Sequence, residues 1–350
     1  MAQLTFLPTT PVFPSTRFQG SKLKIVDWIW DHIKELEFNS VLDAFGGTGS
    51  VSHMLKGKGK RVFYNDILKF NWCIGRALIE NDSVLLADSD LDFILKEQRN
   101  IKYPSLIQKN FKEIYFTDDE NRWIDMAVTN IEHLDDVYKK ALAYFALFQS
   151  CIIKRPFNLF HRKNLYIRSS EVERNFGNKT TWDTPFEVHF RKFVAEANRA
   201  VFSNGQQNKA CNHDIFDVPG HFDLVYIDTP YLSKKGTGVD YLDFYHFLEG
   251  LVNYSEWEGY IDYQTQNRRF KNGKSLWNNK NGIHTAFNKL FKKFQNSVLV
   301  ISYRSDGIPS IEELIAILRQ HKKNVVEVQR KKYKYVLSQN HSEEVVLIGK

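Results

Sequence analysis

The stretch VYIDTPYLSKK, residues 225–235, places an acid, a proline and an aromatic ring directly after a run of strand-forming residues. Asp228 is expected where the chain leaves the core, and Pro230 favours an extended Thr229 because a residue before proline avoids the helical region. The carboxylate and the Thr229 carbonyl could accept both hydrogens of one amino group, while Tyr231 could stack beneath a flat base. Taken alone, the segment would be better explained as a strand-ending turn.

A glycine-rich turn in DAFGGTGS, residues 43–50, provides a second candidate site. Its glycines let the backbone approach a ligand closely at a strand-to-helix turn, where helix N-terminal amides gather. Asp66 ends the next strand, and an acid there can accept hydrogen bonds from a ribose diol. The pair predicts a nucleoside-containing cofactor. Because Ser52 replaces the last glycine of a G-x-G-x-x-G pattern, a dinucleotide is less favoured. A tight turn with a surface acid remains the alternative.

A third acid, Asp214, follows another predicted strand end in KACNHDIFD, residues 209–217. It could bond the edge of an adenine ring while its apolar neighbours Ile215 and Phe216 pack against the ring face. Alone it would be an ordinary loop acid.

Two basic segments could contact a polyanion, which the net charge of +7 also favours. The first, residues 154–168, contains no acid and interleaves its cations with aromatic rings. Phosphate contact combined with base readout needs this mixture, although a solvated basic loop has the same composition. The predicted DNA-binding residues are Lys154, Arg155, Arg162, Lys163 and Arg168, with Arg268 and Arg269 in the second segment.

The elements that must position these residues alternate between strands and helices at both ends of the chain. Strand 40–45, turn 46–49, helix 50–58 and strand 61–66 form a β-α-β unit, which implies parallel strands. The alternation resumes after residue 210, and its last two segments, 333–338 and 343–350, could form an antiparallel ribbon at the sheet edge. We therefore predict a Rossmann-like α/β domain from residues 1–80 and 210–350, with a mainly helical insertion, 81–209, between them.

Other function classes receive little support from the sequence. The three cysteines lack C-x-x-C spacing, and the histidines lack metal-ligand spacing, so neither a disulfide framework nor a metal site is expected. No apolar run approaches 18 residues, which argues against a membrane span. A cytoplasmic protein is expected.

Taken in order, these segments resemble the D12 class of adenine-N6 DNA methyltransferases, the Dam-like group. The resemblance covers most of residues 17–80 and 210–350, and its motif order is the alpha arrangement of that group. The matching segments are RFQGSK (17–22), DAFGGTG (43–49), YND (64–66), HDIFD (213–217), IDTPY (227–231), ISYRSDGIPS (301–310) and EEVVLIGK (343–350).

The resemblance implies a class I methyltransferase fold, S-adenosylmethionine as cofactor and double-stranded DNA as substrate. Asp66 would contact the ribose of the cofactor, and Asp214, beside Ile215, would contact its adenine. Phe18, Gly20 and Lys22 would touch the cofactor or the DNA backbone. The methionine portion would be surrounded by Asp43, Phe45, Gly46, Gly47 and Gly49. The catalytic tetrapeptide would be Asp228, Thr229, Pro230 and Tyr231.

This chain has Thr229 where the family's tetrapeptide has proline. The position contributes its main-chain carbonyl, which threonine also provides, so proline should be tolerated there. Together with Asp228, the carbonyl would draw a flipped-out adenine amine toward tetrahedral geometry. The family also implies a role in protecting sites within a restriction-modification system, with a possible cognate endonuclease.

Three alternative functions remain open at this stage. Cytosine-N4 transfer uses similar geometry but commonly begins its tetrapeptide with serine. A DNA-binding protein on a degenerate methyltransferase scaffold is opposed by the intact motifs. A nucleotide-dependent oxidoreductase is disfavoured by the imperfect dinucleotide pattern. A cytosine-C5 enzyme is disfavoured, since that class needs a cysteine nucleophile, usually after proline, and no cysteine here follows a proline.

Overall fold

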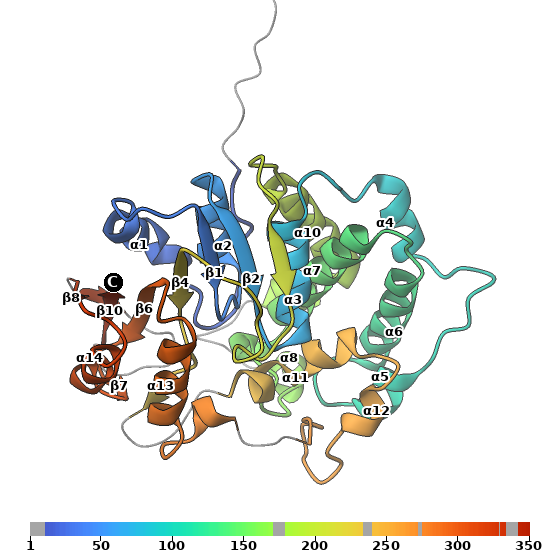
Figure 1. The fold of residues 1–350 in the computed structure, drawn as a ribbon. Coiled ribbons are helices and arrows are strands. Elements are labelled where there is room, and N and C mark those ends of the chain that lie inside the picture. Colours follow the sequence, from blue (N-terminus) through green and yellow to red (C-terminus); the bar gives the residue numbers. More distant parts are fainter. Residues whose placement is uncertain (1–10, 171–178, 234–239, 272–274, 329, 334–341) are drawn as a thin grey trace, which may run out of the picture.

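A central β-sheet with helices on both faces forms the framework of the molecule (Figure 1). A computed structural model describes residues 11–170, 179–233, 240–271, 275–328, 330–333 and 342–350. The strand order is β3-β2-β1-β4-β6-β10-β8, and β9 also pairs with β10. The strands are β1 (Ser40–Asp43), β2 (Arg61–Asn65), β3 (Lys209–Cys211), β4 (Leu224–Ile227), β6 (Val298–Arg304), β8 (Val325–Glu327), β9 (Lys331–Tyr333) and β10 (Ser342–Gly349).

The order and direction of the strands confirm the predicted Rossmann-like methyltransferase sheet. Strand β1 pairs in parallel with β2 on one side and with β4 on the other, so the strand order reverses at this point. The C-terminal strand β10 was expected at an edge, but it runs antiparallel between β6 and β8. The reason is its apolar run Val345–Ile348, which is buried because helices cover both faces of the sheet. Most of the segment predicted as its partner, residues 333–338, lies outside the described residues.

Alternate residues of the strands point into two separate apolar cores. Val41 and Val300 face helices α2 (Ser50–Gly57) and α11 (Tyr241–Val252), whereas Leu42 and Ile301 face α13 (Ile283–Lys293) and α14 (Ile311–Leu318). Smaller elements complete the two ends of the chain. They are η1 (Leu23–Ile25), α1 (Val26–Ile33), β5 (Leu232–Ser233), α12 (Trp257–Tyr260), η4 (Leu276–Asn278) and β7 (Gly307–Ile308).

The chain between β2 and β3 is helical in its described part, and Figure 1 shows most of these helices beyond the β2 and β3 side of the sheet. Phe145 and Phe148 of α7 share one apolar core with Phe70 and with the α2 face of the sheet. The helices are α3 (Lys69–Gly75), the π-helix η2 (Arg76–Glu80), α4 (Asp88–Ile94), α5 (Leu106–Asn110), α6 (Asp118–Glu132), α7 (Val137–Ile153), η3 (Pro156–Asn158), α8 (Tyr166–Ser169), α9 (Lys179–Asp183) and α10 (Phe186–Ala200).

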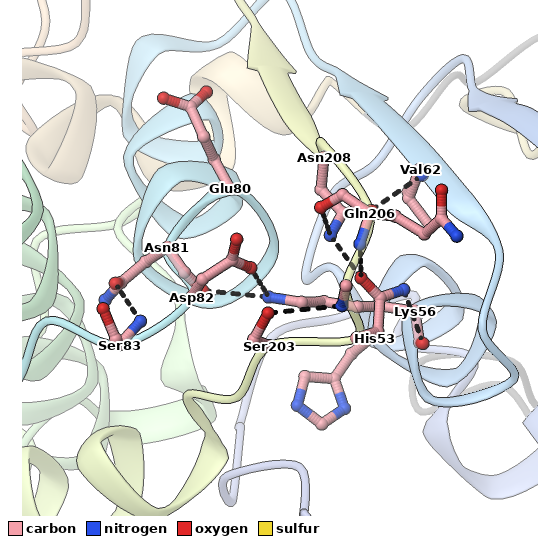
Figure 2. A network of polar contacts seen from close by, with 12 residues as sticks. His53, Lys56, Val62, Glu80, Asn81, Asp82, Ser83, Ser203, Gln206 and Asn208 are labelled. Carbon is pink, nitrogen blue, oxygen red and sulfur yellow. Dashed lines mark hydrogen bonds and ion pairs between the residues drawn. The ribbon is translucent and has the colours of Figure 1, made fainter.

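A polar network beside α2 joins the two ends of this helical segment to the sheet (Figure 2). The fully buried Lys56 donates to the Asn81 carbonyl at 2.9 Å, and its Nζ lies 3.2 Å from Asp82 Oδ1. Asn204 donates to the Lys56 carbonyl, and Asn208 Oδ1 accepts from the amide of β2 residue 62 at 2.9 Å. The segment that leaves the sheet near residue 81 and the segment that returns to it near residue 208 are therefore both bonded to the α2 and β2 region. The proposed domain boundaries at 80/81 and 209/210 stay a prediction.

Among the residues that the structure describes, no helix combines the length and apolar character needed to cross a lipid bilayer. The same part of the chain contains no cluster of three His, Cys, Asp or Glu side chains suited to a metal ion.

Candidate active site

A cavity of about 560 Å³ opens at the carboxyl ends of β1, β2 and β4. Ligands of open α/β sheets bind at this place, where the strand order reverses and the loops diverge. The cavity brings together most of the residues predicted from separate sequence motifs. Its walls include Phe18, Gly20, Lys22, Asp43, Phe45, Gly46, Gly47, Asp66, Asp214, Ile215, Asp228, Thr229 and Pro230. Gly49 and Tyr231, which were also predicted, are not among the lining residues.

The glycine turn after β1 is held tightly against Tyr64 of β2. A Cβ atom on Gly46 would lie 2.1 Å from Tyr64 Cε2, so only glycine fits there. Gly47 and Gly49 adopt φ of +50° and +76°, which side chains disfavour. Gly49 therefore shapes the turn at the start of α2, although it does not reach the cavity.

Two acids on the cavity wall present different hydrogen-bonding capacity. Asp66 accepts from the Gly47 and Leu68 amides, each at 2.9 Å, and burial raises its pKa. Asp43 accepts from Ser52 Oγ at 2.7 Å through Oδ2, whereas its buried Oδ1 has no partner among the described residues. Burial raises the Asp43 pKa to about 7. An unpartnered buried acceptor is costly, so Oδ1 suits a ligand group that carries N–H donors.

The two predicted residues that follow β3 occupy opposite environments. Asp214 is exposed at the cavity rim and accepts from the Phe216 amide at 3.0 Å, whereas Ile215 is buried. An acid with one remaining oxygen beside an apolar side chain can bond the edge of a flat ring and cover its face.

Sequence reasoning missed an aromatic wall of the cavity. Tyr241 and Tyr245 from α11, together with Phe270 and Trp277, line the cavity. The Trp277 ring lies edge-on to Phe45, with 5.0 Å between ring centroids. These residues belong to no local motif, and Phe270 and Trp277 lie within the second basic segment, residues 266–282, which was interpreted only as a DNA contact. The unusually high aromatic content, 14%, was the one indication of such a surface.

Asp228, at the end of β4, is held through one of its two oxygens. Lys22 Nζ lies 3.2 Å from Oδ1, and the Tyr231 hydroxyl donates to the same atom at 2.6 Å. No described residue donates to Oδ2, and the side chain is 17% exposed. Burial raises the Asp228 pKa to about 6, with Lys22 acting in the opposite direction. Oδ2 is therefore available to accept a hydrogen bond from a ligand.

Thr229 follows Asp228 directly in the chain and also lines the cavity. The residue is 2% exposed, and among the described residues no donor contacts its carbonyl oxygen. Its hydroxyl is buried without a described partner, so the side chain contributes no bond that proline would lose. Asp228 and Thr229 are adjacent in the chain and both line the cavity, so a carboxylate oxygen and a carbonyl oxygen without a described donor belong to neighbouring residues of its wall.

The structure gives Tyr231 and Lys22 roles that differ from those predicted. The Tyr231 ring is 5% exposed and packs edge-on against Tyr303 at 5.4 Å, so it does not offer a stacking surface to the cavity. The Lys22 ammonium bonds the Tyr231 hydroxyl and Glu344 and pairs with Asp228. The Tyr231 hydroxyl and the Lys22 ammonium therefore bond protein groups around Asp228 and not a ligand. Buried polar groups need hydrogen-bond partners, and these neighbours provide them.

The prediction of DNA contact is wrong for Lys154, Arg155 and Arg168, because these three side chains are buried. Arg155 is 1% exposed and donates to the backbone carbonyls of residues 115, 159 and 162. Lys154 and Arg168 both pair with Glu120, at 3.0 and 2.7 Å. These side chains hold the loop after α7 against α6, so they cannot reach DNA phosphate in this structure.

The remaining predicted cations are accessible, and two of them border a second cleft. Arg162 and Lys163 are exposed, and Arg269 lies 3.8 Å from Asp243. A cleft of about 690 Å³ contains Lys163 and Arg268 but no acidic residue. Its other polar lining residues are Lys109, Asn110, Lys112, Tyr166, Tyr263, Gln264, Thr265 and Gln266.

The contrast between buried and exposed arginines leads to a prediction. Arg155→Ala should lower the free energy of unfolding by about 3 kcal/mol, because several buried carbonyls lose their donor. Arg162→Ala should change it by less than about 0.5 kcal/mol and instead weaken DNA binding, with a smaller salt dependence. Urea unfolding and DNA titrations at several salt concentrations measure both effects. Equal stability of the two variants would contradict the buried role of Arg155.

Comparison with known proteins agrees with the arrangement of the cavity. The family model of the D12 class N6 adenine-specific DNA methyltransferase matches residues 18–317. The chain is 31% identical over 323 residues to the type II methyltransferase M2.HphI of Haemophilus parahaemolyticus, covering 90% of each chain. It is 26% identical to M.FokI of Planomicrobium okeanokoites, covering 87% of this chain and 47% of that protein. With M.CviAII of Paramecium bursaria Chlorella virus 1 it shares 23% identity over 91% of this chain and 93% of the other. The chain therefore belongs to the D12 class of N6 adenine-specific DNA methyltransferases.

Proposed function

We propose that this chain transfers a methyl group from S-adenosylmethionine to the N6 amine of an adenine in double-stranded DNA, at a specific sequence. The proposal is carried by one observation: Asp228 and Thr229, neighbours in the chain, both line the cavity, and no described residue donates to Asp228 Oδ2 or to the Thr229 carbonyl. An exocyclic amine has two N–H groups and fits this pair of acceptors.

The residues of the cavity fit the cofactor, which supplies an electrophilic methyl group on a cationic sulfonium when bound. Its ribose hydroxyls would donate to Asp66, and its adenine would lie between Asp214 and Ile215. Asp43 Oδ1, a buried acceptor without a described partner, would take the amino group of the methionine portion. Phe18 and Phe45, beside the glycine turn, would enclose the remainder.

The chain's own groups would act on the amine by orientation and electrostatics. The nitrogen lone pair of adenine N6 is delocalised into the ring, which makes it a poor nucleophile. Hydrogen bonds to Asp228 Oδ2 and the Thr229 carbonyl would draw the nitrogen toward tetrahedral geometry and localise that pair. Positioning of this kind supplies much of the rate acceleration, and no covalent enzyme intermediate is required.

The target adenine must leave the duplex to reach these acceptors, at a cost of a few kcal/mol. Tyr231 does not face the cavity, so the stacking surface would come from the aromatic wall, of which Tyr241 and Phe270 are members. Stacking on an aromatic ring offsets roughly 1–3 kcal/mol of the flipping cost. The acid-free basic cleft would hold the flanking DNA through its lysines and Arg268.

Two alternatives make different products. A cytosine-N4 enzyme would modify cytosine, and a degenerate scaffold would bind DNA without turnover. Asp228 Oδ2, to which no described residue donates, and the meeting of most of the predicted residues at one cavity favour turnover. Incubation with S-adenosylmethionine and mixed-sequence DNA, followed by sequencing of modified bases, separates these outcomes. N6-methyladenine at one sequence supports the proposal, whereas N4-methylcytosine or unmodified DNA contradicts it.

A restriction-modification role extends the proposal, because M2.HphI and M.FokI are named as type II methyltransferases. The expected role is protection of sites from a cognate endonuclease. DNA methylated by this chain should then resist cleavage by an endonuclease that recognises the same sequence.

The rate of methyl transfer should fall as the pH drops through about 6. Burial raises the Asp228 pKa to about 6, so the carboxylate is deprotonated above this pH and protonated below it. A protonated Asp228 is a much weaker acceptor for the amine, because Oδ2 no longer belongs to a charged carboxylate. Single-turnover rates between about pH 5 and pH 8 measure the effect, with circular dichroism as a control for folding. A rate that is flat across this range would contradict the role of Asp228.

A further inference from the structure

Three segments far apart in the sequence meet in a buried charge cluster beside Asp228. Lys22 precedes η1, Asp228 directly follows β4, and Glu344 lies within β10. Lys22 Nζ is 2.9 Å from Glu344 Oε1 and 3.2 Å from Asp228 Oδ1. Ser302 of β6 donates to the same oxygen of Glu344. The Glu344 side chain is completely buried, and that of Lys22 is 3% exposed.

The second carboxylate in this cluster is more than charge neutralisation requires. Asp228 alone would balance the Lys22 ammonium, whereas Glu344 adds another buried negative charge, which is costly to desolvate. Glu344 does not line the cavity, so it does not touch a ligand there. Its contacts with Lys22 and Ser302 both serve to place the ammonium. An effect of the Glu344 charge on the cavity would therefore be exerted through the Lys22 ammonium.

We propose that Glu344 is a positioning residue for methyl transfer: it holds the Lys22 ammonium at Asp228 Oδ1, leaving Oδ2 free and strongly accepting toward the adenine amine. The inference rests on the proposed function. By taking part of the ammonium's charge, Glu344 keeps Asp228 from being fully neutralised. The titratable groups that act on Asp228 are Lys22 and Tyr231 by direct contact, Glu344 through Lys22, and Asp43, Tyr226 and Tyr241 at longer range.

The charge balance fixes the sign of the expected change. Burial raises the pKa of Asp228 most, Lys22 lowers it, and Glu344 raises it. Glu344→Gln removes a negative charge but keeps an acceptor for Lys22 and Ser302. The Asp228 pKa should therefore fall, and the acidic limb of the rate profile should move to lower pH by about 1 pH unit. The single-turnover rate near neutral pH should drop about tenfold, because a less basic carboxylate is a weaker acceptor.

The test compares pH profiles of the wild type, Glu344→Gln and the matched control Glu343→Gln. Glu343 neighbours Glu344 on β10 but lies 4.0 Å from Arg330 and outside the cavity, so its variant should keep the wild-type profile. The double variant Lys22→Met, Glu344→Gln should shift the limb the other way, to higher pH, since Lys22 has the larger effect on Asp228. If Glu344 were merely structural, the acidic limb of Glu344→Gln would match that of the wild type.

A second readout does not depend on activity. In protein with ¹³C-labelled aspartate carboxyl groups and no cofactor, the resonance missing in Asp228→Asn should titrate at lower pH in Glu344→Gln. An unmoved titration and an unmoved limb would overturn the role of Glu344, even if the wild type methylates adenine. A wild type that transfers no methyl group would instead refute the proposed function, and the titration would still decide the role of Glu344.

Ser302→Ala provides a variant that leaves all three charges of the cluster in place, in case Glu344→Gln fails to fold. Loss of the Ser302 donor loosens Glu344 and hence the Lys22 ammonium. The single-turnover rate should fall about fivefold with KM for DNA unchanged. An unchanged rate in a folded Ser302→Ala protein would contradict the proposal.

Discussion

Asp228→Ala is expected to lower the rate of methyl transfer by about 10³-fold while leaving cofactor binding nearly intact. The mutation removes the acceptor oxygen that faces the cavity, so the amine loses one of the two bonds that localise its lone pair. Folding should be retained, because Lys22 keeps Glu344 as its partner at 2.9 Å. Single-turnover methylation and calorimetric titration of S-adenosylmethionine measure the two effects separately.

The controls for this prediction use related side chains. Asp228→Asn keeps the shape and one acceptor but adds an amide donor toward the amine, so it should also be strongly impaired. Asp217→Ala removes an exposed acid near the same rim that does not line the cavity, and its rate should match the wild type. Full activity in Asp228→Ala would refute the assignment of the catalytic acid.

Gly46→Ala is expected to weaken cofactor binding at least about tenfold and to lower the free energy of unfolding by about 3 kcal/mol. The added Cβ would lie 2.1 Å from Tyr64 Cε2. The Tyr64 ring cannot easily withdraw, because it is fully buried and its hydroxyl donates to the Gly47 and Asn71 carbonyls. The turn must shift instead, which moves the Gly47 amide away from Asp66. Titration with S-adenosylmethionine and urea unfolding measure the two effects.

Gly57→Ala is the matched control for this substitution. Gly57 ends α2, and a Cβ added there would meet nothing within 4 Å. This variant should bind the cofactor normally and change stability by no more than about 1 kcal/mol, in the stabilising direction. If both alanine variants behaved alike, the close contact with Tyr64 would not govern the shape of the site.

The parts of the site that were predictable are those encoded by short local patterns. The turn at Gly46 and Gly47 and the acids Asp66 and Asp228 directly follow strands. Parallel strands place their carboxyl ends at one edge of a sheet, so residues that follow different strands meet there. The β-α-β pattern thus predicted the parallel strands of the sheet and a ligand site at their carboxyl ends.

The cationic segment shows where such reasoning failed. Arg155 and Arg162 occur in the same run of basic residues, yet one is buried and the other exposed. Composition cannot distinguish them, because the carbonyl of residue 115 and the Glu120 carboxylate that bury this loop come from α6 and the segment before it. Tyr231 was misjudged for the same reason, since its partner Lys22 lies 209 residues away in sequence.

The sequence by itself determined the fold class, the glycine turn after β1 and the position of the proposed catalytic acid, because each depends on a strand and the few residues after it. Only the tertiary structure decided which cations are accessible, which aromatic rings line the cavity, and that Glu344 stands behind Lys22 and Asp228. Those features depend on contacts between segments up to 322 residues apart. Burial and hydrogen-bond satisfaction act on such neighbours in space, and no local pattern records them.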